Sequence, residues 1–187
     1  TTIGFMELAA SQPAQALTSA RNGHAAEAAS PFPALLAVEL VERGQTAAEA
    51  VVRSQLKASP LAPGGATMVA MAYARLLFDL QRPKDAQVLL DDLTRIQPDA
   101  MEPWLLLATL QVQNKRLPAA TRSLQTYMGL ARQSNDERAS RGLTQAYLLM
   151  AQIAEQQKDF AAATAWLDRI ENADDIMAAQ MRRASLL

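Results

Sequence analysis

Few residues in this sequence are suited to catalysis or to binding a metal ion. The chain has a single histidine, His24, and no cysteine. The usual zinc sites and the Cys–His or Ser–His pairs of nucleophilic enzymes need more of these residues than the chain offers. We therefore interpret His24 as a surface or packing residue, and we expect no catalytic residue, no metal site and no cofactor.

Two acidic pairs and one glycine doublet also have simpler explanations. Neighbouring residues in a helix point about 100° apart, so neither Asp91-Asp92 nor Asp174-Asp175 converges on one substrate atom. Negative charge is favourable at a helix start, and Asp174-Asp175 predicts one. Pro63-Gly64-Gly65 lacks the Lys-Ser/Thr of a phosphate-binding loop and is interpreted as a linker between helices. The sequence thus indicates a protein that is not an enzyme.

Composition favours an all-helical protein with a sizeable core. Half of the 187 residues are hydrophobic, only 5% are aromatic, and alanine and leucine dominate the apolar set. The 18 basic and 19 acidic residues are spread along the chain and leave a net charge of −1, which argues against a nucleic-acid partner. No apolar run approaches the roughly 20 residues of a membrane span, so we expect no direct membrane insertion.

An internal repeat is the most informative feature of the sequence. A shift of 34 residues places five residues on counterparts of the same kind: Tyr73, Ala74, Ala86, Leu90 and Leu93 fall on Leu107, Ala108, Ala120, Leu124 and Tyr127. A shift of 43 then gives a third copy, in which Trp104 falls on Tyr147, Ala108 on Ala151 and Ala120 on Ala163. Each copy predicts two helices around a tight turn, with a small alanine where their backbones approach closely.

Residues at the borders of these copies predict where the helices begin and end. Lys115-Arg116-Leu117-Pro118 is expected to be the turn of one hairpin, since proline suits the first turn of the following helix. Gln97-Pro98-Asp99 is expected to separate two hairpins, with Asp99 capping the next helix. Nine extra residues between Met128 and Leu143 predict a longer second helix in one copy and a longer first helix in the next, with a turn at Ser134-Asn135-Asp136. Either a ledge for a partner or a tolerated insertion explains them.

The repeat resembles the tetratricopeptide (TPR) family. The resemblance is carried by Trp104 at the fourth place, Leu107-Ala108 at the seventh and eighth, Ala120 at the twentieth and Pro98 at the thirty-second place of the preceding copy. Lys158-Asp159-Phe160 stands where the family often has a Gly-Asp-Tyr turn. The resemblance implies an all-α fold, a right-handed α-solenoid of antiparallel helix hairpins. The order of repeats also resembles the middle of long bacterial TPR proteins, some of them of the cell envelope, which favours that compartment over the cytoplasm.

We expect the chain to be organised as a series of such units. Residues 1–30 are interpreted as a helical cap or degenerate unit, in which a helix is broken at Asn22-Gly23 and Phe5, Met6 and Leu8 pack over it. The expected repeats are residues 31–62, 67–100, 101–142, 143–173 and a partial unit at 174–187.

The resemblance also implies a binding surface. In the family, the first helix of each hairpin lines a concave groove that binds a peptide or helix of a partner. The corresponding residues here are Met68, Met71, Arg75, Phe78, Glu102, Leu105, Thr109, Gln113, Gln145, Leu148, Gln152 and Gln156. The Lys and Asn clamp of the chaperone-binding class is absent, because its places hold Met71, Leu105 and Leu148.

The leading hypothesis is therefore a protein–protein interaction scaffold with a protein or peptide ligand. One alternative is a recruiting or regulatory arm of a larger enzyme or envelope complex. Another is self-association into a homodimer through the last helix or the inserted segment.

Overall fold

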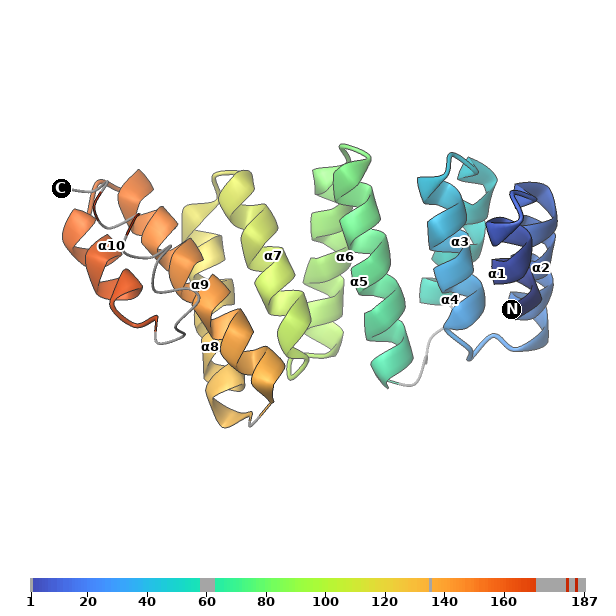
Figure 1. Cartoon of the computed structure of the whole chain (residues 1–187). Coiled ribbons are helices and arrows are strands. Elements are labelled where there is room, and N and C mark those ends of the chain that lie inside the picture. The colour runs from blue at the N-terminus through green and yellow to red at the C-terminus, as the bar shows by residue number, and fades with distance from the viewer. Residues whose placement is uncertain (1, 58–62, 135, 171–180, 182–183, 185–187) are drawn as a thin grey trace. The chain divides into compact units, whose positions relative to one another are not determined.

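All regular elements in the described part of the chain are helices (Figure 1). The computed structural model describes residues 2–57, 63–134, 136–170, 181 and 184. No strand occurs among these residues, which confirms the predicted all-α class. The chain divides into two compact units, Thr1–Gln97 and Pro98–Leu187, and each is described by itself.

Unit 1 consists of three helix hairpins. Its helices are α1 (Thr2–Ala9), α2 (Pro13–Ala26), α3 (Phe32–Glu42), the 3-10 turn η1 (Thr46–Ala48), α4 (Glu49–Lys57), α5 (Pro63–Asp79) and α6 (Pro83–Ile96). Consecutive helices pair as α1 with α2, α3 with α4, and α5 with α6, and α5 also packs on α3 and α4. The first helices of the second and third hairpins thus lie next to one another.

The described part of unit 2 contains two hairpins. They are α7 (Met101–Gln113) with α8 (Leu117–Gln133), and α9 (Glu137–Gln156) with α10 (Phe160–Leu167). α9 packs on both α7 and α8. With 17 residues in α8 and 20 in α9, against 14 in α6 and 13 in α7, the predicted lengthening on both sides of the insertion is confirmed.

The alanines that define the repeat are buried, as predicted. Ala74 and Ala108 are fully buried in the first helix of their copies, and Ala86 and Ala120 in the second. Ala151 and Ala163 take the same places in the third copy and are also fully buried. A methyl group at these places lets two helices pack closely, and replacing it by a larger side chain would force them apart.

Each hairpin turns through one residue in the left-handed backbone conformation. This residue is Ser11, Gly44, Gln81, Lys115 or Lys158, with φ of 59°, 89°, 59°, 57° and 62°. The last three are spaced by the two repeat shifts. In the turn after α7, the Lys115 amide donates to the Val112 carbonyl at 3.0 Å and the Arg116 amide to the Gln111 carbonyl at 2.8 Å. This paired bonding satisfies the last carbonyl groups of the first helix and reverses the chain in three residues.

Prolines then start several of the second helices. Pro13 begins α2, Pro83 begins α6 and Pro118 is the second residue of α8. Proline is tolerated there because the first amides of a helix have no partner within it. The turn predicted at residues 115–118 lies at residues 114–116, because Leu117 and Pro118 already belong to α8.

Three local predictions are wrong. The helix at residues 13–26 is not broken at Asn22-Gly23, because burial of Ala16 and Ala20 outweighs the cost of one glycine of about 1 kcal/mol. Gly64 and Gly65 are not a linker, since they lie in the first turn of α5. Asp99 does not cap α7, whose N-cap residue is Ala100 and has no side-chain hydrogen bond.

The N-terminal residues form a hairpin rather than a loose cover. Leu8 on α1 is buried, whereas Met6 is 67% exposed and does not pack over α2 as expected. The expected partial unit at residues 174–187, including Asp174-Asp175, lies outside the described residues apart from 181 and 184.

Candidate functional site

The residues implied as a binding groove fall in both units. Met68, Met71, Arg75 and Phe78 lie on α5 in unit 1, and the other eight lie on α7 and α9 in unit 2. All of them occupy first helices of their hairpins. The two sets form two separate candidate surfaces, one in each unit.

The surface on α5 combines exposed and buried members. Met68 is 52% exposed, and Arg75, about two helical turns further along α5, is also exposed. Phe78 is half-buried. Met71 is only 8% exposed and forms part of the core of unit 1. The side chains available to a ligand on α5 are therefore Met68, Arg75 and part of Phe78.

The candidate residues on α7 and α9 include two leucines. Leu105 and Leu148 are both half-buried. Leu105 packs on the core between α7, α8 and α9, and Leu148 packs on the cluster that includes Leu167 and Ile170. Contacts with the core hold these two side chains in place, while part of each stays accessible to an apolar group of a ligand.

The polar residues of this surface are more accessible. Glu102, Gln113, Gln145 and Gln156 are exposed, and Thr109 and Gln152 are half-buried. The Thr109 hydroxyl donates to the Leu105 carbonyl of its own helix at 2.9 Å, so its remaining capacity is as an acceptor. Glutamine side chains both donate and accept, which suits them to bind the amide and carbonyl groups of a peptide backbone.

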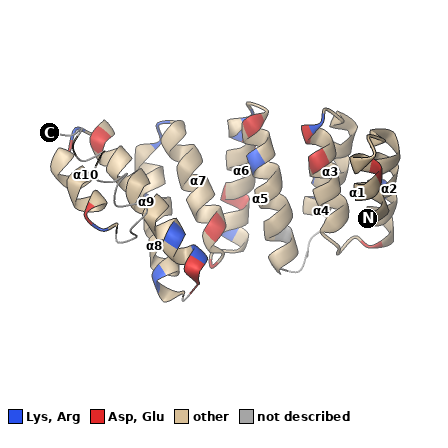
Figure 2. Ribbon diagram, viewed as in Figure 1, with Lys and Arg blue, Asp and Glu red and all other residues tan. Residues whose placement is uncertain are grey.

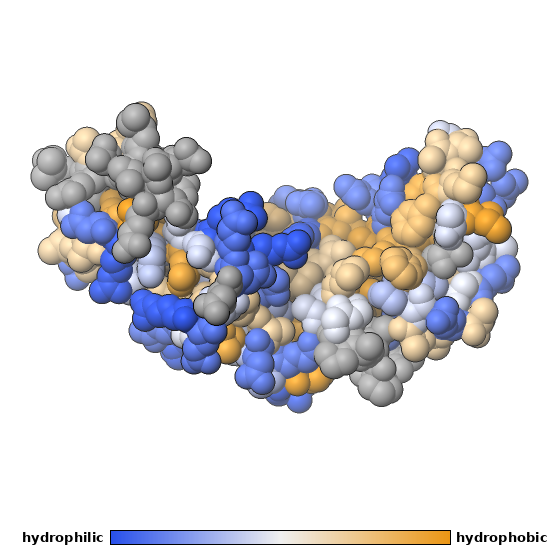
Figure 3. All heavy atoms as spheres, turned by 60° about the horizontal axis from the view of Figure 1, so that its bottom comes forward, coloured by the Kyte–Doolittle hydropathy of each residue, from blue (hydrophilic) through white to orange (hydrophobic). Residues whose placement is uncertain are grey.

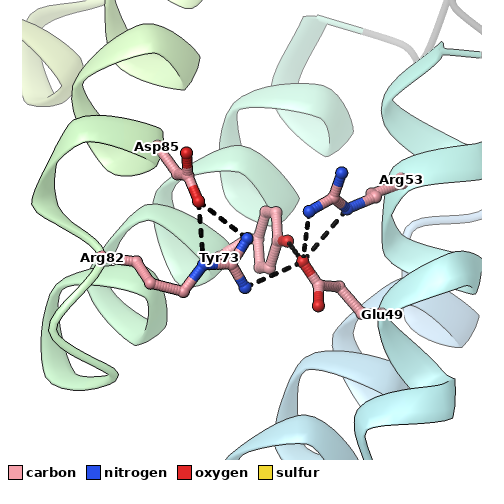
Figure 4. A network of polar contacts seen from close by, with 5 residues as sticks. All are labelled: Glu49, Arg53, Tyr73, Arg82 and Asp85. Carbon is pink, nitrogen blue, oxygen red and sulfur yellow. Dashed lines mark hydrogen bonds and ion pairs between the residues drawn. The ribbon is translucent and has the colours of Figure 1, made fainter.

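A polar network in unit 1 was not predicted from the sequence (Figure 4). Its centre is Glu49 at the start of α4, whose Oε1 atom accepts hydrogen bonds from Arg53 Nη2 at 2.7 Å and Arg82 Nη1 at 3.0 Å. The Tyr73 hydroxyl donates to the same oxygen. Arg82 also contacts Asp85 at 2.8 Å. The network joins α4, α5 and the start of α6.

These contacts change the protonation of the groups involved. Burial raises the pKa of Glu49, but hydrogen bonds from Tyr73, Arg53 and Arg82 outweigh burial and lower the pKa from 4.5 to about 2. Burial, followed by the hydrogen bond to the Glu49 carboxylate, raises the pKa of Tyr73. Glu49 is thus held ionised and Tyr73 neutral, which favours the bonded state of the network.

Only one part of this network could have been recognised in the sequence. Glu49 and Arg53 are four residues apart in the orientation that favours an ion pair on a helix. Tyr73 and Arg82 come from the next hairpin and carry no local signal. The network links α4, α5 and the start of α6 through hydrogen bonds between side chains.

The other residues whose side chains could take part in chemistry contact neighbouring side chains. His24 Nε2 lies 3.0 Å from the Ser54 hydroxyl, which links α2 to α4. Asp92 pairs with Arg95 at 2.7 Å, and Asp91 accepts from Gln87 at 3.4 Å. Among the described residues, no group of three His, Asp or Glu side chains is arranged to hold a metal ion.

Figure 2 shows acidic and basic residues interspersed along the helices in view. No helix in the described part is both long enough and apolar enough to cross a membrane.

Comparisons with known proteins support the repeat. Residues 67–110 match the family model described as tetratricopeptide repeat. No curated protein matches the sequence. Among solved structures, MamA (residues 41 to the end) from Desulfovibrio magneticus RS-1 is similar over 97% of this chain and 93% of its own, with 16% identity and a TM-score of 0.62. YrrB, described as a TPR protein with an unusual peptide-binding site, is similar over 98% of this chain and 89% of its own, with 13% identity and a TM-score of 0.66.

At these identities the two structures establish the fold, and the family model identifies the repeat itself. The matched residues include most of α5, all of α6 and most of α7, where the 34-residue period is clearest. The chain therefore carries a tetratricopeptide repeat at residues 67–110 within the helical-repeat fold of TPR proteins.

Proposed function

We propose that this chain is a non-catalytic binding module that holds a peptide or helix of a partner protein on the first helices of its hairpins. The observation that carries the proposal is the helical spacing on α7 and α9. It puts the half-buried Leu105 on one helix face with Thr109 and Gln113, and the half-buried Leu148 on one helix face with Gln145, Gln152 and Gln156. An alternation of apolar and amide groups suits an extended peptide, whose backbone and side chains alternate in the same way.

The comparisons favour this class of function. TPR proteins are interaction modules, and YrrB, which has the same fold, is described as having a peptide-binding site. The face of each unit that is visible in Figure 3 presents hydrophobic residues among hydrophilic ones. Such a mixture is common at interfaces that form between separately folded partners.

Affinity capture with matched variants tests the proposal. The first variant, Gln145→Ala/Gln152→Ala/Gln156→Ala, removes three amides from α9. The control, Gln125→Ala/Gln133→Ala, removes exposed amides from the second helix α8 of the same unit. Alanine favours helix at each place, so circular dichroism should show that both variants are folded.

We expect a partner captured by the wild-type chain to be retained by the control and lost by the α9 variant. Retention by both variants would remove α9 from the binding surface. Loss from both would indicate a binding site that is not confined to the first helices, and would also overturn the proposal.

A further inference from the structure

Unit 1 contains a cavity on the side of its second helices. Its walls come from α4, α5 and α6, and its volume is about 500 Å³. Pockets that bind ligands commonly measure roughly 300–1,000 Å³. The cavity borders the Glu49 network. Arg53, Tyr73 and Arg82, which bind Glu49, also line the cavity.

The cavity is lined mainly by apolar side chains. Leu56 from α4, Leu77 from α5 and Leu93 from α6 contribute to its walls. Val88 and Ile96, also on α6 and in its lining, are 62% and 67% exposed. Single exposed apolar residues are common, but two beside an apolar cavity extend it into a larger hydrophobic surface. A small molecule inside the cavity would leave Val88 and Ile96 uncovered. The extended hydrophobic surface therefore favours a polypeptide as the ligand.

The charges around the cavity are predominantly positive. Four cations line it against two anions: Arg53, Lys57, Arg82 and Arg95 against Asp85 and Asp92. The Glu49 carboxylate beside the cavity contacts Arg53 and Arg82, so the excess is one positive charge. Asp85 is paired with Arg82 and Asp92 with Arg95. Arg53 contacts Glu49 through Nε and Nη2, which leaves the donors of Nη1 outside that contact.

Lys57 is the cation best placed to bind a ligand. It is exposed, lies in the last turn of α4, and has no ion pair among the residues that the structure describes. Arg53, on the same helix four residues earlier, is paired with Glu49, so it is Lys57 that gives this edge of the cavity an unmatched positive charge. A carboxylate at this edge would be complementary to it.

We propose that this cavity docks a peptide segment of a partner protein in which a large apolar side chain lies close to an acidic one. The apolar side chain enters between Leu56, Leu77 and Leu93, and the carboxylate pairs with Lys57 and Arg53. The site uses α4, α5 and α6 of unit 1 and shares no residue with the surface of α7 and α9 proposed above.

Selection from a library of random peptides displayed on phage tests this proposal with the full chain. Wild type and two variants, Lys57→Glu and Val88→Glu, serve as targets. The matched control is Lys84→Glu, which makes the same charge reversal at an exposed residue of α6 outside the cavity. All three residue changes are at exposed positions, and thermal unfolding followed by circular dichroism checks that the targets are folded. Lys57→Met, which keeps most of the aliphatic stem, replaces Lys57→Glu if the latter unfolds.

Wild type should enrich peptides with a large apolar residue near Asp or Glu. Lys57→Glu should bind these peptides at least about tenfold more weakly, since a charge-assisted bond is lost, while Lys84→Glu binds them as wild type does. Selection against Lys57→Glu should instead enrich basic peptides. Enrichment without acidic residues, or equal binding by wild type and Lys57→Glu, would overturn the proposal. The selected peptides are also tested on the α9 variant Gln145→Ala/Gln152→Ala/Gln156→Ala. Peptides that lose binding only to this variant would also overturn the proposal, while supporting the first-helix surface.

Discussion

The close approach of α8 and α9 depends on a glycine, and the same substitution at a second glycine provides its control. A Cβ atom built at Gly142 in α9 would overlap the hydroxyl oxygen of Tyr127 and lie 2.8 Å from its Cζ. Tyr127 is 3% exposed, so its ring cannot move into solvent without leaving the core. At Gly129 in α8 nothing lies within 4 Å of the same atom.

Gly142→Ala and Gly129→Ala should therefore change stability in opposite directions. Both gain about 1 kcal/mol of helix propensity. At residue 142 this gain is opposed by overpacking of about 1–3 kcal/mol, so the net change is a loss of up to about 2 kcal/mol. The two variants should thus differ by about 1–3 kcal/mol in free energy of unfolding.

Tryptophan fluorescence during urea unfolding is the appropriate assay. Both tryptophans, Trp104 and Trp166, lie in unit 2 with the two glycines, so the signal reports the unit that is changed. The reasoning would be refuted if Gly142→Ala stabilised the unit as much as Gly129→Ala does.

A double-mutant cycle identifies the atom responsible. Tyr127→Phe removes the overlapping oxygen but keeps the ring, so it should recover part of the loss caused by Gly142→Ala. The coupling should be about 1 kcal/mol, a size typical of residues in contact. Purely additive effects would show that the cost at residue 142 has another source.

Three further predictions concern turns, a buried hydrogen bond and pH. Lys115→Gly and Lys158→Gly should each stabilise unit 2 by about 0.5–1 kcal/mol in the same fluorescence assay, since both residues have positive φ and glycine carries no steric cost there; no gain would contradict this. Ser123→Ala should lower the free energy of unfolding by about 1–2 kcal/mol, because the buried Gln111 side chain loses the 2.9 Å hydrogen bond that the Ser123 hydroxyl donates to it. An unchanged midpoint of urea unfolding would exclude a stabilising role for this bond. The lowered pKa of Glu49 stabilises the fold above its unfolded value of 4.5, and this contribution is lost as pH falls towards 2. Glu49→Gln should therefore flatten the decrease in stability between these pH values, measured by circular dichroism, and an equally steep decrease would contradict the assignment.

The repeat could be predicted from the sequence because its signals are periodic and local. The buried alanines recur at the two repeat shifts, and prolines at the start of α6 and α8 mark the second helices of two successive copies. Any one of them is weak, but all are satisfied by the same hairpin. The errors at Asn22-Gly23 and Gly64-Gly65 share one cause, since glycine was interpreted by its intrinsic preference although tertiary packing decides its place.

The candidate sites could be predicted only in part. First-helix positions follow from the period, so the sequence could place Leu105, Gln152 and Met68 on these helices. It could not show that Met71 is buried, because helical spacing alone does not say how closely the neighbouring hairpin packs. The cavity beside Lys57 was missed for a related reason, since its walls come from three helices and depend on distances between them.

The nine inserted residues show why spacing and structure must be considered together. Two explanations were open from the sequence, a projecting ledge or a tolerated surface insertion. In the structure Met128, Ala131 and Ala139 are 5%, 2% and 2% exposed and belong to one core with Tyr127. The longer helices therefore add a buried layer to unit 2, whatever their outer face binds. Because Gly142 provides the space for Tyr127 in that layer, the insertion is coupled to the packing of α8 against α9, and shortening it should destabilise unit 2 rather than leave it unchanged.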